Sequence, residues 1–405
     1  MAFIRAIFYL YLFIIPFYPA LSIINIGGYP IVTIYNLAIF TMILLLFFIK
    51  KKKTMMRFFL VATILISLII SVFLGWSVVK CMTNICLYAI PVLIFVMVEI
   101  TELSLEMFSK IMSISLSVSA LLSILALIGV LTKSSGFYVN IYYVDGAAGI
   151  IGIVLCLYRA LSVNKKYKLF PTILLGVTGF IVVLLGQSRA RLLVATVSII
   201  ITVFTLIYVN KRSYNGRITR RVISIVLITI ISGILVYRFI PSFSLYVDNI
   251  ILRLNMLSQN DVNITYRESE ASLYLQMFRQ NPIYGRGWGI LYNSQYLNSQ
   301  SEQYMAHNMF ASLLGVGGLF FCVPYFMFLL SLLRKTVVGV LKNHNEQIII
   351  AMISIIDVIL LGLGSAGFGK LSGILFMTLT FVCLNKKDIV HNIQAFSSKT
   401  AYNHY

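Results

Sequence analysis

Charged residues are scarce in this sequence, and acidic residues are the scarcest. Only 11% of the 405 residues are charged, with 12 Asp and Glu against 32 Lys and Arg, whereas soluble globular chains carry about 25% charged residues. The 5 cysteines are scattered without the spacing of a metal site, and an odd number does not suit a disulfide framework. The composition therefore excludes a soluble globular protein and predicts no metal site.

Apolar residues take up the remaining space. The chain is 60% hydrophobic, its mean hydropathy is +0.95, and about twelve apolar stretches are long enough to cross a bilayer core of about 30 Å. Backbone groups inside lipid must be hydrogen-bonded within the segment, so we expect helices. The sequence predicts an all-α, polytopic transmembrane bundle. Its predicted spans are residues 5–25, 30–49, 57–76, 84–100, 110–132, 146–163, 169–187, 190–209, 222–241, 308–333, 347–365 and 370–385.

Basic clusters indicate the orientation of these spans. Most Lys and Arg residues follow every second span, at residues 50–57, 165–168, 211–221, 334–342 and 386–387. Loops rich in Lys and Arg stay in the cytoplasm, so both termini are predicted to be cytoplasmic. The first span lacks a small-residue cleavage site and is interpreted as a retained span. We expect a multi-pass protein of a bacterial plasma (inner) membrane with its working face on the periplasmic, extracytoplasmic side.

One segment between spans is much longer than the others. Residues 242–306 have little apolar continuity and are predicted to form a large extracytoplasmic loop, in which a stretch such as 267–280 has the spacing of a surface helix. Long loops in compact proteins are usually functional or disordered, and the many aromatic residues here argue against disorder. The predicted organisation is spans one to nine in residues 1–241, the loop at 242–306, spans ten to twelve in 307–388 and a cytoplasmic tail at 389–405.

Two arginines on the predicted outer side are candidates for an anion site. Arg189 and Arg191 lie in Gly186-Gln-Ser-Arg-Ala-Arg191, where the eighth span begins. The guanidinium group offers a planar fork of donors that matches phosphate oxygens, and the first amides of a helix add partial positive charge. The alternative is interfacial anchoring, in which both arginines extend to lipid headgroups.

Three further residues combine titratable chemistry with a defined position. His307 opens the tenth span and has a pKa suited to accepting a proton from a sugar hydroxyl, although it could instead cap the helix. Asp145 stands at the start of the sixth span, where it could stabilise the helix or line a site. Asp357 lies mid-span, which indicates either a functional or a hydrogen-bonded structural group.

The order of these motifs resembles the O-antigen polymerase and O-antigen ligase superfamily. Gln187-Ser-Arg-Ala190, Arg267, Asn281-Pro-Ile-Tyr-Gly-Arg-Gly287 and His307-Asn308 before Gly315, Gly317 and Gly318 follow one another as in that family. The resemblance implies a GT-C-like, metal-independent glycosyltransferase without a cofactor. It also implies that the donor is a glycan on undecaprenyl diphosphate, that the acceptor is a lipid-linked repeat unit, and that a chain-length regulator protein is a candidate partner.

The resemblance also implies roles for individual residues. Arg189 and Arg267 would hold the diphosphate and stabilise it as the leaving group, and His307 would orient or deprotonate the acceptor hydroxyl. Arg191 and Arg286 are plausible helpers, and Asn308, Glu268 and Asp145 complete the predicted substrate-binding set. The sequence lacks a glutamate shortly after His307-Asn308 that many ligases have, which favours a polymerase for O-antigen or capsule-type polysaccharide over a ligase that transfers polymer to lipid A–core.

Two other classes of protein remain open. Twelve spans also suit a polysaccharide transporter or a flippase for lipid-linked oligosaccharides, which often have a long central loop and polar residues near the midplane. Here the central loop at 164–168 is short and the charged candidates lie at one face, which favours an enzyme. The second alternative is a membrane-embedded assembly protein. No feature of the sequence indicates binding to nucleic acid, because its basic residues flank spans.

Overall fold

The computed structural model describes most of the apolar part of the chain. The described residues are 1–21, 24–26, 29–49, 55–127, 145–162, 168–185, 189–209, 231, 234, 237, 238, 248, 262–289, 292–293, 302–303, 308–343, 346–364 and 371–384. Within them the only strands are two antiparallel two-residue pairs, β1 (Asn25–Ile26) with β2 (Tyr29–Pro30) and β3 (Tyr292–Asn293) with β4 (Glu302–Gln303).

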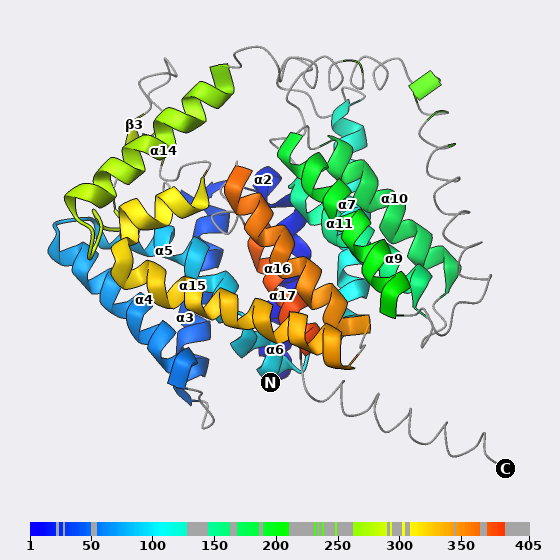
Figure 1. Ribbon diagram of the computed structural model, residues 1–405, viewed down its shortest axis with the longest axis horizontal. Coiled ribbons are helices and arrows are strands. Elements are labelled where there is room, and N and C mark those ends of the chain that lie inside the picture. Colours follow the sequence, from blue (N-terminus) through cyan, green and yellow to red (C-terminus); the bar gives the residue numbers. More distant parts are fainter. Residues whose placement is uncertain are drawn as a thin grey trace.

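All other regular elements in these residues are helices (Figure 1). In chain order they are α1 (Ala2–Ile14), η1 (Ile15–Phe17), α2 (Tyr18–Leu21), α3 (Ile31–Ile49), α4 (Met55–Phe73), α5 (Val78–Leu93), α6 (Phe95–Thr101), α7 (Leu105–Leu127), α9 (Gly146–Leu161), α10 (Leu169–Leu185), α11 (Arg189–Val209), α14 (Val262–Gln280), α15 (Met309–Asn343), α16 (Glu346–Gly364) and α17 (Ser372–Leu384).

Several of these helices are suited to cross a membrane. Within the described residues, α3, α4, α7, α15 and α16 are long and apolar enough, and the bent pair of α5 and α6 would be a sixth. Shorter apolar helices accompany them at Ala2–Phe17, Gly146–Leu161, Leu169–Leu185, Ala190–Leu206 and Ser372–Leu384. The protein is therefore a polytopic, helical membrane protein.

Eleven of the twelve predicted spans coincide with helices of the structure. The exception is 222–241, which lies almost wholly outside the described residues. The total of twelve spans and the division of the chain at 241, 306 and 388 therefore stay predictions.

Three predicted spans are not the single straight helices that were expected. The first is interrupted by η1 at Pro16. The fourth bends by 51° between α5 and α6, just after Pro91, because proline removes a backbone donor and clashes with the preceding turn. The tenth runs on to Asn343 and contains a break at Gly318. Periodicity of apolar residues does not register such breaks.

Several hydroxyl groups inside the helices donate to the backbone of the preceding turn. Thr63, Ser71, Thr101 and Thr378 each donate to the carbonyl oxygen four residues earlier, over 2.7–2.9 Å. This pattern lets a polar side chain sit in an apolar environment without an unpaired donor.

Glycines allow a close helix contact between α9 and α10. A Cβ atom at Gly152 would lie 2.9 Å from the carbonyl oxygen of Leu175, and one at Gly179 would lie 2.7 Å from that of Gly149. Every residue of α9 is buried. Figure 1 shows α9 beside α10 and α11 at one side of the molecule, with α14, α4 and the first half of α15 at the other and α16 and α17 between.

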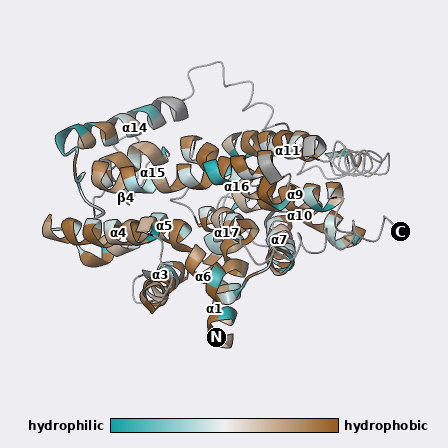
Figure 2. Ribbon diagram, turned by 60° about the horizontal axis from the view of Figure 1, so that its bottom comes forward, coloured by the Kyte–Doolittle hydropathy of each residue, from teal (hydrophilic) through white to brown (hydrophobic). Residues whose placement is uncertain are grey.

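Helix α14 differs from the other helices in polarity. It is the least apolar of the long helices, and in Figure 2 it carries teal residues and lies at the edge of the molecule above α15. Its buried Tyr274 packs on α15, where a Cβ atom at Gly315 would lie 2.7 Å from the carbonyl oxygen of Tyr274. The prediction of a helix within the long loop is confirmed.

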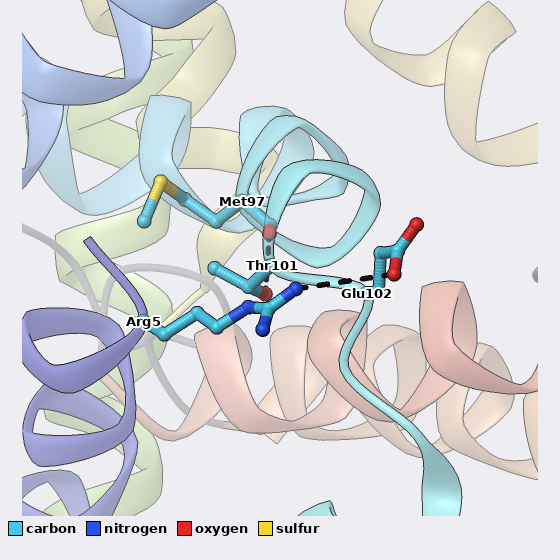
Figure 3. A network of polar contacts seen from close by, with 4 residues as sticks. All are labelled: Arg5, Met97, Thr101 and Glu102. Atoms are coloured by element: carbon cyan, nitrogen blue, oxygen red, sulfur yellow. Dashed lines mark hydrogen bonds and ion pairs between the residues drawn. The ribbon is translucent and has the colours of Figure 1, made fainter. Parts of the chain in front are cut away.

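Three acidic residues near the end of α6 and the start of α7 are all paired with basic side chains. Glu99 binds Arg57 at 2.7 Å, Glu106 binds Lys110 at 3.1 Å, and Glu102 lies 3.9 Å from Arg5. Figure 3 shows the last pair, where α1 meets the end of α6. The side chains of Glu102 and Glu106 are more than half exposed.

Candidate functional site

A buried ion pair joins the first residues of α9 and α11. The Arg191 Nη2 atom lies 3.2 Å from Asp145 Oδ1, and the two side chains are 9% and 1% exposed. Asp145 also caps α9, because Oδ1 accepts a hydrogen bond from the Ala147 amide at 3.1 Å, and its own amide donates to the Pro16 carbonyl at 2.8 Å. Its Oδ2 atom has no hydrogen-bond partner among the described residues.

The ion pair brings together two of the predicted substrate-binding residues. Asp145 and Arg191 lie far apart in the sequence, and their contact fixes the start of α11 against η1 and α9. Arg189 is the first residue of α11, and its side chain lies outside the described residues.

Two side-chain contacts show which helix ends lie together at one end of the bundle. The starts of α9 and α11 meet at the Asp145–Arg191 pair. The end of α9 meets the start of α16, because the Ser162 hydroxyl donates to Glu346 at 2.6 Å. Because α16 starts where α9 ends, α16 runs back along α9. The end of α16 therefore lies beside the starts of α9 and α11.

The start of α15 also lies at this end of the bundle. A Cβ atom at Gly362, near the end of α16, would lie 2.8 Å from the Met309 methyl carbon at the start of α15. We call this part of the molecule the Asp145 end. It holds the backbones of Arg189, Arg191 and Asn308, and Figure 1 shows these helix ends around α2.

The glycine-rich segment Asn281–Gly289 is a rigid loop bound to the break in α15. The amides of Arg286 and Gly287 donate to the carbonyls of Gly315 and Val316 at 2.9 and 3.0 Å. In return, the amides of Leu319 and Phe320 donate to Pro282 and Ile283, both at 2.9 Å. The loop thus supplies the hydrogen bonds that the helix loses at its break.

Glycine is required on both sides of this contact. Gly318 has φ 60° and ψ −171°, and Gly285 has φ 68°, values that side-chain-bearing residues rarely adopt. A Cβ atom at Gly318 would also lie 2.5 Å from the Gly285 amide nitrogen. The glycines of this segment thus allow a close approach of the two backbones.

Trp288 anchors the same loop in the transmembrane core. The indole is 1% exposed, its Nε1 donates to the Ser67 hydroxyl at 2.7 Å, and its amide donates to Ser71 at 3.0 Å. The Asn84 side chain donates to the Trp288 carbonyl at 2.6 Å. These partners on α4 and α5 were not identified from the sequence, although Ser67, Ser71 and Asn84 are polar residues inside apolar stretches.

The remaining predicted substrate-binding residues have different environments. Arg286 is exposed and donates to the Gln280 carboxamide. Asn308 caps α15, because its Oδ1 accepts hydrogen bonds from the amides of Phe310 and Ala311 at 3.0 and 3.1 Å. Glu268 is exposed on α14, whereas Glu270 on the same helix is fully buried and was not singled out.

None of the three predicted catalytic side chains lies among the described residues, since that of Arg189 is also outside them. Arg267 lies in the first half of α14, but its side chain is outside the described residues, and His307 is outside them altogether. The convergence of Arg189, Arg267 and His307 therefore stays a prediction.

Asp357 is buried in the middle of α16. It is 1% exposed, and its Oδ1 accepts a hydrogen bond from the Ser198 hydroxyl of α11 at 2.5 Å. This bond joins the two helices at mid-depth, so a structural role for Asp357 is supported by a specific contact.

Comparison with known proteins identifies the central part of the chain. Residues 174–326 match the family model of the O-antigen ligase domain, which covers α11, α14, the Asn281–Gly289 loop and the break in α15. No curated protein matches the chain. Members of the matched family are membrane glycosyltransferases of polysaccharide biosynthesis that act on lipid-linked glycans. Residues 174–326 thus carry the match to the O-antigen ligase domain family, which polysaccharide polymerases and O-antigen ligases share.

Proposed function

We propose that this protein is a polysaccharide polymerase of the extracytoplasmic face of a bacterial plasma membrane. It transfers a glycan from undecaprenyl diphosphate to a lipid-linked repeat unit. The observation that carries the proposal is the Asp145 end. There the start of α11, with Arg189, lies at the same end as the start of α15, which begins two residues after His307. The matched family favours this enzyme class over a transporter.

The proposed reaction is a single displacement at the anomeric carbon of the donor sugar. An acceptor hydroxyl attacks that carbon while His307 takes the hydroxyl proton. The bond from the carbon to the diphosphate oxygen breaks, and its electron pair leaves on undecaprenyl diphosphate. Arg189 and Arg267 stabilise the negative charge that develops there. Arg191 supports them indirectly, because the pair with Asp145 fixes the start of α11.

Replacing Arg267 with Ala tests this proposal. We expect the variant to lose surface polymer in a complemented deletion strain, because a leaving-group contact is missing; removing one such contact typically slows the reaction about 100-fold or more. The measurement is the glycan profile on a gel, together with an immunoblot of the membrane fraction that verifies insertion.

Arg279→Ala is the matched control, because Arg279 is an exposed arginine on the same helix. It should keep the wild-type profile. Normal chain lengths in Arg267→Ala would contradict the proposed function.

The second candidate is an O-antigen ligase, which the description of the matched family favours. A ligase would transfer finished polymer from the same donor to lipid A–core. The profile of the deletion strain separates the two. A single repeat unit on the acceptor indicates a polymerase, whereas polymer accumulating on undecaprenyl diphosphate indicates a ligase.

A further inference from the structure

A cavity of about 260 Å³ lies between α2, the start of α3 and the first half of α5. Its polar lining residues are Tyr18, Thr33, Asn36 and Thr83, and the rest of its described lining is apolar, including Leu37 and Leu87. None of the described lining residues is charged. The cavity is therefore suited to a neutral ligand rather than to a phosphate, which is usually bound by Arg or Lys.

Asn36 provides the most specific feature of this cavity. Its Oδ1 atom accepts a hydrogen bond from the Tyr11 hydroxyl at 2.8 Å, which fixes the orientation of the carboxamide. The residue is only 6% exposed, and its amide nitrogen has no hydrogen-bond partner among the described residues. A ligand in the cavity can accept a hydrogen bond from this nitrogen.

Thr83 and Tyr18 add a hydrogen-bond acceptor and a flat aromatic surface to the lining of the cavity. The Thr83 hydroxyl donates to the Val79 carbonyl at 2.9 Å, so its oxygen lone pairs can accept hydrogen bonds from a ligand. Tyr18 adds an aromatic ring. An apolar wall with a few fixed donors and acceptors matches a sugar ring, which presents C–H faces and hydroxyl edges. An isoprenoid chain would leave the Asn36 amide unpaired.

The cavity adjoins the Asp145 end. Tyr18 lines the cavity and interacts electrostatically with Asp145 and Arg191. The backbone places α2 there independently, because the Asp145 amide donates to Pro16, two residues before Tyr18. A glycan attached to a diphosphate at the start of α11 would therefore have its first sugars near this cavity.

We propose that the cavity between α2, α3 and α5 is a subsite for a neutral sugar residue of the lipid-linked glycan, with Asn36 and Thr33 as hydrogen-bonding residues. This inference rests on the proposed function, because it takes the diphosphate of the same molecule to lie at Arg189. It adds residues from the first hundred of the chain to a site whose family motifs all lie between 174 and 326.

The test compares two lipids as ligands of the purified full-length protein. One is the lipid-linked repeat unit extracted from the deletion strain, and the other is undecaprenyl diphosphate without a glycan. We expect Thr33→Val and Asn36→Leu to weaken binding of the glycosylated lipid about tenfold, and to leave binding of the glycan-free lipid unchanged. The two variants act independently, so Thr33→Val remains informative if Asn36→Leu lowers the folded yield.

Thr41→Val is the matched control, because Thr41 lies on α3 but is exposed and donates to the Leu37 carbonyl. It should bind both lipids as the wild type does. Equal weakening of both lipids by Thr33→Val would overturn the sugar subsite in favour of a polyprenyl site, and unchanged binding of both would overturn it as well. If the wild type binds neither lipid, the proposed function fails, and the subsite fails with it.

Discussion

Asp145 illustrates how one residue holds several parts of the molecule. It caps α9, pairs with Arg191 and joins η1 through its amide. The sequence indicated its helix-start position, because a carboxylate is stabilised by the first amides of a helix. The sequence did not indicate that Arg191 is its partner, because Arg191 is 46 positions later and several other arginines could have formed the ion pair.

Removing the carboxylate of Asp145 should destabilise the protein strongly. Asp145→Ala removes one partner of a buried ion pair, which typically costs about 3–5 kcal/mol. We expect a clearly lower melting temperature in detergent. The double variant Asp145→Ala with Arg191→Met should recover most of the loss, apart from about 1 kcal/mol for the missing helix cap.

Glu106→Ala serves as the comparison for this experiment. It removes the partner of Lys110 from a pair whose side chains are 68% and 64% exposed, and exposed pairs contribute about 0–1 kcal/mol. An Asp145→Ala variant as stable as Glu106→Ala would contradict the importance of the buried pair.

Among the elements, α15 departs furthest from the sequence prediction. Its apolar residues run on from Met309 with no gap, so a pattern of hydrophobicity predicts one helix. The break at Gly318 depends on hydrogen bonds from the Asn281–Gly289 loop, which no local pattern encodes. Most helix positions were predictable, because apolar length alone determines them, whereas breaks and partners depend on tertiary contacts.

Gly318→Ala should prevent the loop from binding the break. Alanine there would adopt a backbone conformation that costs about 1–3 kcal/mol, and its Cβ would meet the Gly285 amide nitrogen at 2.5 Å. We expect a lower yield of monodisperse protein in size-exclusion chromatography and a lower melting temperature.

Gly339→Ala is the control on the same helix, because its Cβ would meet only side-chain atoms of Ile348, at 3.0 Å and beyond. Alanine is otherwise favoured over glycine in a helix, so this variant should keep the wild-type yield. Equal behaviour of the two variants would mean that the break does not need glycine.

At the scale of the whole molecule, the contacts and the charge pattern agree. The predicted orientation puts the starts of the sixth, eighth and tenth spans on one side, and the structure brings the starts of α9, α11 and α15 to one end. Charge counting could predict this arrangement because it needs only the number and order of the spans. It could not predict the cavity beside Tyr18, which depends on how α2, α3 and α5 pack.

Cysteine labelling tests which end faces outward. Glu268 and Glu106 are both exposed and lie on opposite sides in the predicted topology. Glu268→Cys should react with a membrane-impermeant maleimide in intact spheroplasts, and Glu106→Cys should react only after permeabilisation. The five native cysteines are free and buried, so the wild-type protein should give little background. The reverse pattern would invert the proposed topology.

The anchoring of Trp288 also has a consequence for the time course of synthesis. Asn84 and its hydrogen-bond partner on Trp288 are 204 positions apart, and chains grow at about 5–20 residues per second, so roughly 10–40 s separate their emergence from the ribosome. During that interval α4 and α5 are already made, while the carbonyl that Asn84 will bind does not yet exist. The N-terminal helices can therefore reach their final packing only after Trp288 has been translated, because the hydrogen bonds that Ser67, Ser71 and Asn84 make with it form only then.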